Sequence, residues 1–143
     1  MLTLSDIITW EVLQCYFFVG RIHPTKNIHE LFKVFKMIKD RIPDAKLIIV
    51  GKPVIEEYYK RVKSMADDSV IFTGYVSDEE LPYYYAACDV YVTCSLSEGF
   101  NLPLVEAQKY EKPVVTYDIG PHREVVTRGA LVKMGDIKGF MMQ

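Results

Sequence analysis

Cysteine is scarce in the 143-residue chain: Cys15, Cys88 and Cys94 are the three present, and none forms a C-x-x-C pair. Together with three scattered histidines they cannot be assembled into a zinc framework, and their odd number argues against a disulfide-built scaffold. All three lie in or beside apolar runs, where a free cysteine behaves as a small buried hydrophobe. We therefore expect a reducing compartment and no bound metal.

Long apolar runs and a net charge of one sign are also missing. No run approaches the ~18 residues that a membrane-spanning helix needs, and the first 14 residues lack the basic start and apolar stretch of a secretory signal. The 17 basic and 19 acidic residues give a net charge of −2, which argues against a whole surface that binds nucleic acid. We therefore expect a cytoplasmic protein without a nucleic-acid partner.

The basic residues are unevenly distributed along the chain. Of the 17, 11 lie within residues 21–63 and none lies within residues 64–108. Most of the early lysines fall on the polar faces of predicted helices, which is typical of a solvated surface. Contact with an anionic partner or with the inner face of a membrane is the alternative interpretation.

Half of the residues are hydrophobic, and they occur as short apolar runs that alternate with segments of helical period. The pattern predicts helices over residues 27–41 and 55–66, a helix that begins with the capping box Ser77–Glu80, and a helix with Pro103 in its first turn. The predicted strands are solidly apolar and cover residues 15–20, 46–50, 70–73, 89–94, 113–117 and 130–132. Such strands are typical of a parallel sheet covered on both faces, a doubly wound α/β fold. Periodicity does not separate a Rossmann-like from a flavodoxin-like strand order.

Glycines follow four of these strands, at Gly20, Gly51, Gly74 and Gly99. In a doubly wound sheet, ligands bind beyond the carboxyl ends of the strands. The glycine-containing turns therefore indicate the binding edge before any motif is considered.

Two cations follow the first strand. Arg21 comes directly after it, and Lys26 follows five residues later in GRIHPTKN. A guanidinium can hold a phosphate through two hydrogen bonds, and an ammonium adds a second charge. The pair favours a phosphate site, and two unrelated surface cations are the alternative.

The loop SLSEGFNLPLVE contains two carboxylates, Glu98 and Glu106. Gly99 allows a tight turn, and the helix that follows presents free N–H groups to an anion. Two carboxylates could serve a hydrolase, but Glu106 lies within the predicted helix. Hydrogen bonds from the carboxylates to sugar or ribose hydroxyls therefore fit better than hydrolysis.

Other motifs are absent or uninformative. No strand is followed by G-x-G-x-x-G, which argues against a dinucleotide oxidoreductase, and there is no Walker sequence, G-x-S-x-G or helix-turn-helix. The run Tyr83–Tyr85 at helical spacing fits packing rather than base stacking. His122 in GPHREVV either points into the cleft or caps a helix.

Four segments of the chain match the sequence pattern of a known protein family. In order, they are FVGRIHPTKN, LIIVGKP, FTGYVSDEELPYYYAACDVYVTCSLSEGFNLPLVEAQKYEKPVV and DIGPHREVV. Over about residues 16–137 the chain resembles the carboxyl-terminal half of retaining glycosyltransferase family 4, the group 1 glycosyltransferases. Those enzymes have two Rossmann-like domains (the GT-B fold) and use nucleotide-sugar donors. The resemblance rests above all on Glu98 and Glu106, eight residues apart, with Arg21 and Lys26 upstream.

The resemblance implies a role for each matching residue. Arg21 and Lys26 would bind the donor diphosphate and stabilise the leaving nucleoside diphosphate without a metal or other cofactor. Glu98 would face the donor sugar, and Glu106 would hold the ribose hydroxyls. The remaining donor-binding positions would be Gly20, the wall formed by Gly51 and Lys52, the base pocket of Gly74, Tyr75 and Val76, and the loop residues Gly99, Phe100, Asn101 and Leu102.

The chain departs from the family pattern in three respects. Gly120-Pro121 replaces a pair of glycines, the closing helices are missing, and no amino-terminal acceptor domain is present. We therefore interpret residues 1–14 as a leader or linker from a missing domain and residues 15–143 as a nucleotide-sugar-binding domain. The expected partner is an amino-terminal domain in cis or in trans. A non-catalytic nucleotide-sugar-binding module and a GT-B-type epimerase relative are the alternatives.

Overall fold

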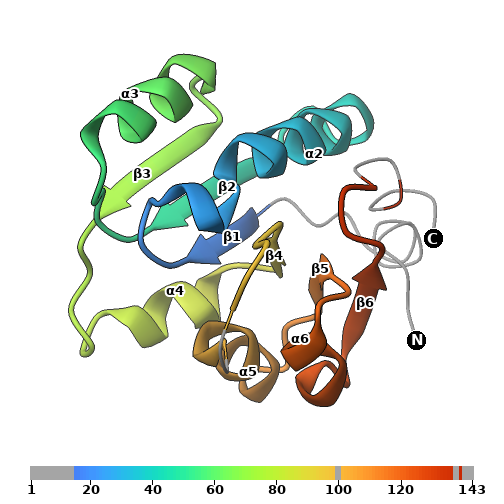
Figure 1. The fold of residues 1–143 in the computed structure, drawn as a ribbon. Helices are drawn as coiled ribbons and strands as arrows, with labels where there is room; N and C mark the ends of the chain where they lie inside the picture. Colours follow the sequence, from blue (N-terminus) through green and yellow to red (C-terminus); the bar gives the residue numbers. More distant parts are fainter. Residues whose placement is uncertain (1–14, 99–100, 137–138, 140–143) are drawn as a thin grey trace.

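A computed structural model describes residues 15–98, 101–136 and 139. Its strands are β1 (Cys15–Val19), β2 (Lys46–Val50), β3 (Val70–Gly74), β4 (Val90–Thr93), β5 (Val114–Tyr117) and β6 (Gly129–Val132). Its helices are the 3₁₀ turn η1 (Pro24–Lys26), α2 (Ile28–Arg41), α3 (Glu56–Met65), α4 (Leu81–Ala87), α5 (Leu102–Lys109) and α6 (Gly120–Val125). Strands and helices alternate as the apolar pattern predicted (Figure 1). The predicted leader, residues 1–14, lies outside the described residues.

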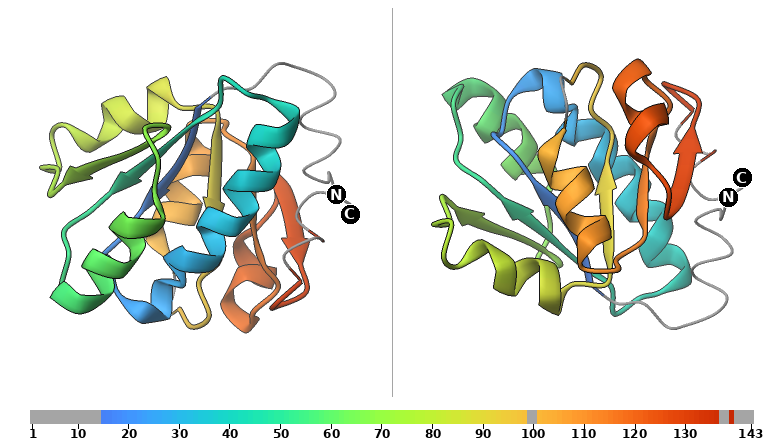
Figure 2. Two further views of the ribbon diagram at one scale, coloured as in Figure 1. Left: turned by 90° about the horizontal axis from the view of Figure 1, so that it is seen from above. Right: turned by 90° about the horizontal axis from the view of Figure 1, so that it is seen from below.

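The strands form one parallel sheet in the order β3-β2-β1-β4-β5-β6. This is the Rossmann order, which periodicity had left open. Helices α2 and α3 cover one face of the sheet, and α4, α5 and α6 cover the other (Figure 2). The chain therefore changes faces between β3 and β4, as a doubly wound sheet requires.

Burial follows from this layering. Strands β4 and β5 are buried along their whole length, which is why they are continuously apolar rather than alternating. Helix α2 buries the stripe Ile28, Leu31, Phe35 and Ile38 against the sheet, while Lys33 and Lys36 face solvent. Within the described part of the chain, no helix combines the length and apolarity needed to cross a membrane.

The start of α4 differs from the prediction. Ser77 caps as expected, since its Oγ accepts from the Glu80 N–H at 3.3 Å, but residues 78–80 form a turn and the α-helix begins at Leu81. The Leu81 N–H still donates to the Ser77 carbonyl at 3.0 Å, but Pro82 has no N–H to donate to the Asp78 carbonyl, so the α-helical hydrogen bonds do not continue through this turn.

Candidate functional site

Strands β1 and β4 are neighbours at the centre of the sheet. The chain leaves the carboxyl end of β1 toward one face and the end of β4 toward the other, so the connections separate there. Crevices at such a switch point are the usual ligand sites of open α/β sheets. Two segments meet at this point: η1 after β1, and residues 94–98 after β4.

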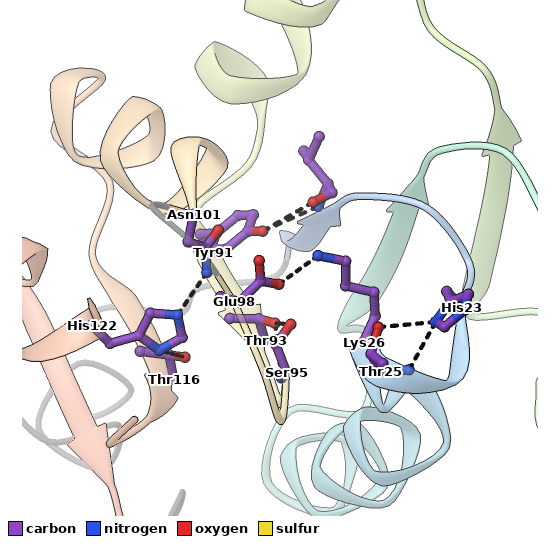
Figure 3. Close-up of polar contacts among 11 residues, drawn as sticks. His23, Thr25, Lys26, Tyr91, Thr93, Ser95, Glu98, Asn101, Thr116 and His122 are labelled. Carbon is purple, nitrogen blue, oxygen red and sulfur yellow. Dashed lines mark hydrogen bonds and ion pairs between the residues drawn. The ribbon is translucent and has the colours of Figure 1, made fainter. Parts of the chain in front are cut away.

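An ion pair joins the two segments. Lys26 Nζ lies 2.6 Å from Glu98 Oε1, and the two side chains are only 17% and 10% exposed. Figure 3 shows the lysine extending from η1 toward the carboxylate. The structure therefore brings together two of the predicted catalytic residues, 72 positions apart in the sequence.

Main-chain contacts hold the same segments together. The Leu96 N–H donates to the Thr25 carbonyl at 3.1 Å, and Asn27 Nδ2 donates to the Cys94 carbonyl at 3.1 Å. Beneath them, the buried Tyr91 hydroxyl donates to the Val19 carbonyl at 3.2 Å. These hydrogen bonds hold the backbone on both sides of the ion pair in place.

Asn27 takes part in a second set of contacts. Its Nδ2 also donates to Glu30 Oε2 at 2.5 Å, and the Tyr117 hydroxyl donates to that same oxygen at 2.6 Å. Burial and the adjacent Glu30 raise the pKa of Tyr117, so this hydroxyl remains a donor. Glu30 in α2 therefore connects Asn27 with the end of β5.

His122 lies in α6 and is fully buried. Its Nε2 accepts from Asn101 Nδ2 at 2.8 Å, which places the ring proton on Nδ1, 2.9 Å from the Tyr117 carbonyl and 2.9 Å from Thr116 Oγ1. Burial lowers the pKa of His122, so the ring is neutral at pH 7. The histidine thus neither points into an open cleft nor caps a helix, the two roles weighed from the sequence.

The glycine turns after β1, β2 and β3 lie side by side. The Gly51 N–H donates to the Gly74 carbonyl at 3.0 Å, and the Gly20 N–H donates to the Val50 carbonyl at 2.9 Å. A Cβ on Gly51 would lie 1.8 Å from the Gly20 carbonyl oxygen, so only glycine fits this approach. Three of the predicted edge glycines therefore form one continuous backbone surface.

Other predicted residues are more exposed. Arg21 and Lys52 face solvent on this edge, and Tyr75 is 73% exposed. Within the described residues no ion pair of Arg21 is found. Val76 and Gly74 are half-buried.

Helix α5 carries the last of the predicted residues. Leu102, its first residue, is 56% exposed. Glu106, one turn further along, is 3.6 Å from Lys109 on the same helix. Gly99 and Phe100 lie outside the described residues.

The buried polar contacts of Asn27, Glu30, Thr116 and Tyr117 were not predicted from the sequence. Asn27 and Asn101 each directly precede a helix with φ of 55°, and an asparagine at a helix start is a weak signal for such a backbone. Glu30 and Tyr117 are 87 residues apart, so nothing local relates them.

The arrangement is suited to an anionic, hydroxyl-rich ligand. Lys26 and Arg21 supply positive charge, and Glu98 can accept from hydroxyls. Asn101, the N-cap residue of α5, makes no side-chain hydrogen bond to the first N–H groups of that helix. No cluster of three or more metal-ligating side chains is found in the described part of the chain.

A family model described as "Glycosyl transferases group 1" matches residues 13–141. O-antigen chain mannosyltransferase B of Escherichia coli is 32% identical over 132 residues, covering 87% of this chain and 33% of that protein. O-antigen chain mannosyltransferase RfbU of Salmonella typhimurium is 34% identical over 133 residues, covering 89% and 36%. The chain thus spans about a third of the length of these relatives.

Solved structures share the fold. HepE of Anabaena, crystallised with UDP and glucose, superposes with a TM-score of 0.80 at 24% identity, covering 97% of this chain and 40% of that one. The C-terminal domain of the group 1 glycosyl transferase LpcC from Francisella tularensis gives a TM-score of 0.74 at 22% identity, covering 99% and 80%. At these identities the likeness establishes the fold alone.

Proposed function

The chain belongs to the group 1 glycosyl transferases, and from this membership we propose that it is the donor-binding part of a retaining enzyme that transfers a hexose from a nucleoside-diphosphate sugar to an acceptor. The observation that carries the proposal is the Lys26–Glu98 ion pair at the switch point of the sheet. In this proposal Lys26 is the cation that would bind phosphate, and the adjacent Glu98 is the carboxylate that would accept from sugar hydroxyls. The names of two relatives as mannosyltransferases and the UDP and glucose bound to HepE support this ligand class.

The diphosphate would be held by Lys26, Arg21 and the start of α5. Arg21 and Lys26 stand at the same strand end, and the uncapped N–H groups of α5 carry the positive end of a helix dipole. These groups would stabilise the negative charge that develops on the leaving nucleoside diphosphate. We therefore propose donor binding without a metal ion, and expect a chelator to leave it unchanged.

The remaining donor groups would follow the edge of the sheet. Glu98 would accept from the sugar hydroxyls, and Glu106 would give up its 3.6 Å contact with Lys109 to accept from the ribose. The backbone of Gly74, Tyr75 and Val76 would contact the base, with Gly51 and Lys52 as the neighbouring wall.

An amino-terminal acceptor domain, in cis or in trans, would complete the enzyme. Exposed apolar side chains follow the ends of β3 and β4 at this edge: Tyr75 is 73%, Leu102 is 56% and Leu96 is 43% exposed. A second domain facing the edge would cover such a surface. It would also supply the acceptor site that a single sheet lacks.

Calorimetric titration of the chain with UDP, GDP, ADP and NAD tests the proposal. We expect one nucleoside diphosphate to bind and NAD not to, because no G-x-G-x-x-G is present. Lys26→Ala should weaken the interaction about tenfold or more, since a hydrogen bond to a charged group contributes about 1.5–3 kcal/mol.

Lys60→Ala is the matched control, because Lys60 is 74% exposed on α3 and belongs to no site contact. Equal affinity in both variants, or binding of NAD alone, would contradict the proposal.

A further inference from the structure

Two buried asparagines flank the ion pair. Asn27 directly follows Lys26 and is 2% exposed, and Asn101 lies three residues after Glu98 and is 8% exposed. Both have φ of 55°, a left-handed conformation that costs a non-glycine residue energy. Such backbone persists only where surrounding contacts hold it, and each asparagine has them.

The contacts of Asn27 lead to the end of β5. Its amide donates to Glu30 and to the Cys94 carbonyl, and Glu30 accepts from the Tyr117 hydroxyl. The Tyr117 ring is fully buried. Its hydroxyl donates to the same Glu30 oxygen that accepts from Asn27, so it helps to hold Glu30 against Asn27.

The contacts of Asn101 lead to the same residue. Its amide donates to His122, whose other ring nitrogen donates to the Tyr117 carbonyl and lies beside Thr116. Tyr117 thus contacts both partners. Its hydroxyl donates to Glu30, the partner of Asn27, and its carbonyl accepts from His122, the partner of Asn101.

We infer that Tyr117, Glu30 and His122 form a positioning unit that holds Lys26 and the start of α5 in the arrangement that binds the donor diphosphate. The inference rests on the proposed function. The three residues touch no ligand in this scheme, and they act through Asn27 and Asn101. If the unit were loosened, only a fraction of molecules would hold the binding arrangement, and the apparent dissociation constant would rise by the inverse of that fraction.

Tyr117→Phe tests the inference, with Tyr16→Phe as its matched control. Both tyrosines are fully buried on interior strands of the sheet, but the Tyr16 hydroxyl has no hydrogen-bond partner among the described residues. The binding readout is the affinity for the nucleoside diphosphate that binds the wild type, measured well below the melting temperature. We expect Tyr117→Phe to weaken binding about tenfold, as when roughly a tenth of molecules remain competent, and Tyr16→Phe to leave affinity unchanged.

Hydrogen exchange supplies a readout that needs no ligand. The Leu96 amide, bonded to the Thr25 carbonyl, reports whether the two segments stay together. We expect faster exchange at Leu96 in Tyr117→Phe and not in Tyr16→Phe. Glu30→Gln, whose amide oxygen can still accept from Tyr117, should keep affinity within about twofold of wild type, while Glu30→Leu should behave like Tyr117→Phe.

The outcomes separate the two claims. A wild type that binds no nucleoside diphosphate would overturn the proposed function. A wild type that binds, together with a Tyr117→Phe variant of equal affinity and unchanged Leu96 exchange, would overturn the positioning unit alone. Equal losses in Tyr117→Phe and Tyr16→Phe would show a general effect of removing a buried hydroxyl, and would also overturn it.

Discussion

Replacing Gly51 with alanine should destabilise the chain far more than the same replacement at Gly74 or Gly120. Gly51 has φ of 145°, and its added Cβ would lie 1.8 Å from the Gly20 carbonyl oxygen. Gly74 has φ of 73° with open space around it, and Gly120, the first residue of α6, has neither constraint. The three positions therefore separate backbone strain from steric overlap.

The expected magnitudes follow from these geometries. Gly120→Ala should be neutral or stabilise by about 0.4–1 kcal/mol, and Gly74→Ala should cost about 1–2 kcal/mol. At Gly51, strain of about 1–3 kcal/mol adds to two weakened hydrogen bonds of about 1 kcal/mol each, from Gly51 to Gly74 and from Gly20 to Val50. The total is roughly 3–5 kcal/mol, a large part of the ~5–15 kcal/mol stability of a domain.

Urea unfolding followed by circular dichroism measures all three variants. At about 4 °C per kcal/mol for a chain of this length, Gly51→Ala should also melt about 12–20 °C below wild type. A loss at Gly51 no larger than that at Gly74 would show that the Gly20 turn moves aside freely. The backbone surface formed by the edge glycines would then not be a fixed feature of the site.

Three further predictions concern the site. Glu106→Ala should weaken nucleoside diphosphate binding by about tenfold. Glu98→Ala should not weaken it, because this change removes the anion that competes for Lys26, but it should weaken binding of the intact donor sugar; equal losses on titration with the diphosphate would mean that the roles are misassigned. Burial lowers the folded-state pKa of His122. Its contribution to stability is therefore present above the unfolded pKa of about 6.5 and is lost as the pH falls from there toward the folded pKa, by at most about 1.4 kcal/mol per pH unit. Unfolding measured at pH 5 and 7.5 should show this loss in the wild type and less of it in His122→Gln. The chain alone should transfer no sugar, because catalysis needs an oriented acceptor in a dry site; acceptor glycosylation by it at about 1 per second or faster would overturn the half-enzyme interpretation.

The parallel sheet was predictable because each strand is a short, continuous apolar run closed by glycine or a polar turn. KLIIV before Gly51 and CYFFV before Gly20 are short apolar runs of this kind. Because each is followed by a segment of clear helical period, a buried strand is the common interpretation of both. The strand order was not predictable, since periodicity records burial and not neighbours. The start of α4 was placed too early because the capping box was weighed without the proline two residues beyond it.

The polar residues of the candidate site could be predicted from the sequence, but the buried residues that hydrogen-bond around them could not. Lys26 and Glu98 follow strands that end at one edge, so their proximity follows from topology. Tyr117 was assigned only to a strand, because its hydrogen bond to Glu30 depends on how α2 lies across the sheet. His122 was misjudged because its partners come from two other segments, with Asn101 before α5 and with Thr116 and Tyr117 in β5.

The short contact between Lys26 and Glu98 has a kinetic consequence. An ammonium already matched by a carboxylate 2.6 Å away adds little to the long-range potential of this edge. Attraction of an anion from solution therefore falls to the exposed Arg21 and Lys52, and is weakened by salt over a Debye length of about 8 Å. In the proposed site, Lys26 would act only after arrival, when it would exchange the Glu98 carboxylate for the anionic ligand. In stopped-flow measurements, ionic strength and Arg21→Ala should change the association rate. The double variant Lys26→Ala with Glu98→Ala removes both charges of the pair, and it should change mainly the dissociation rate.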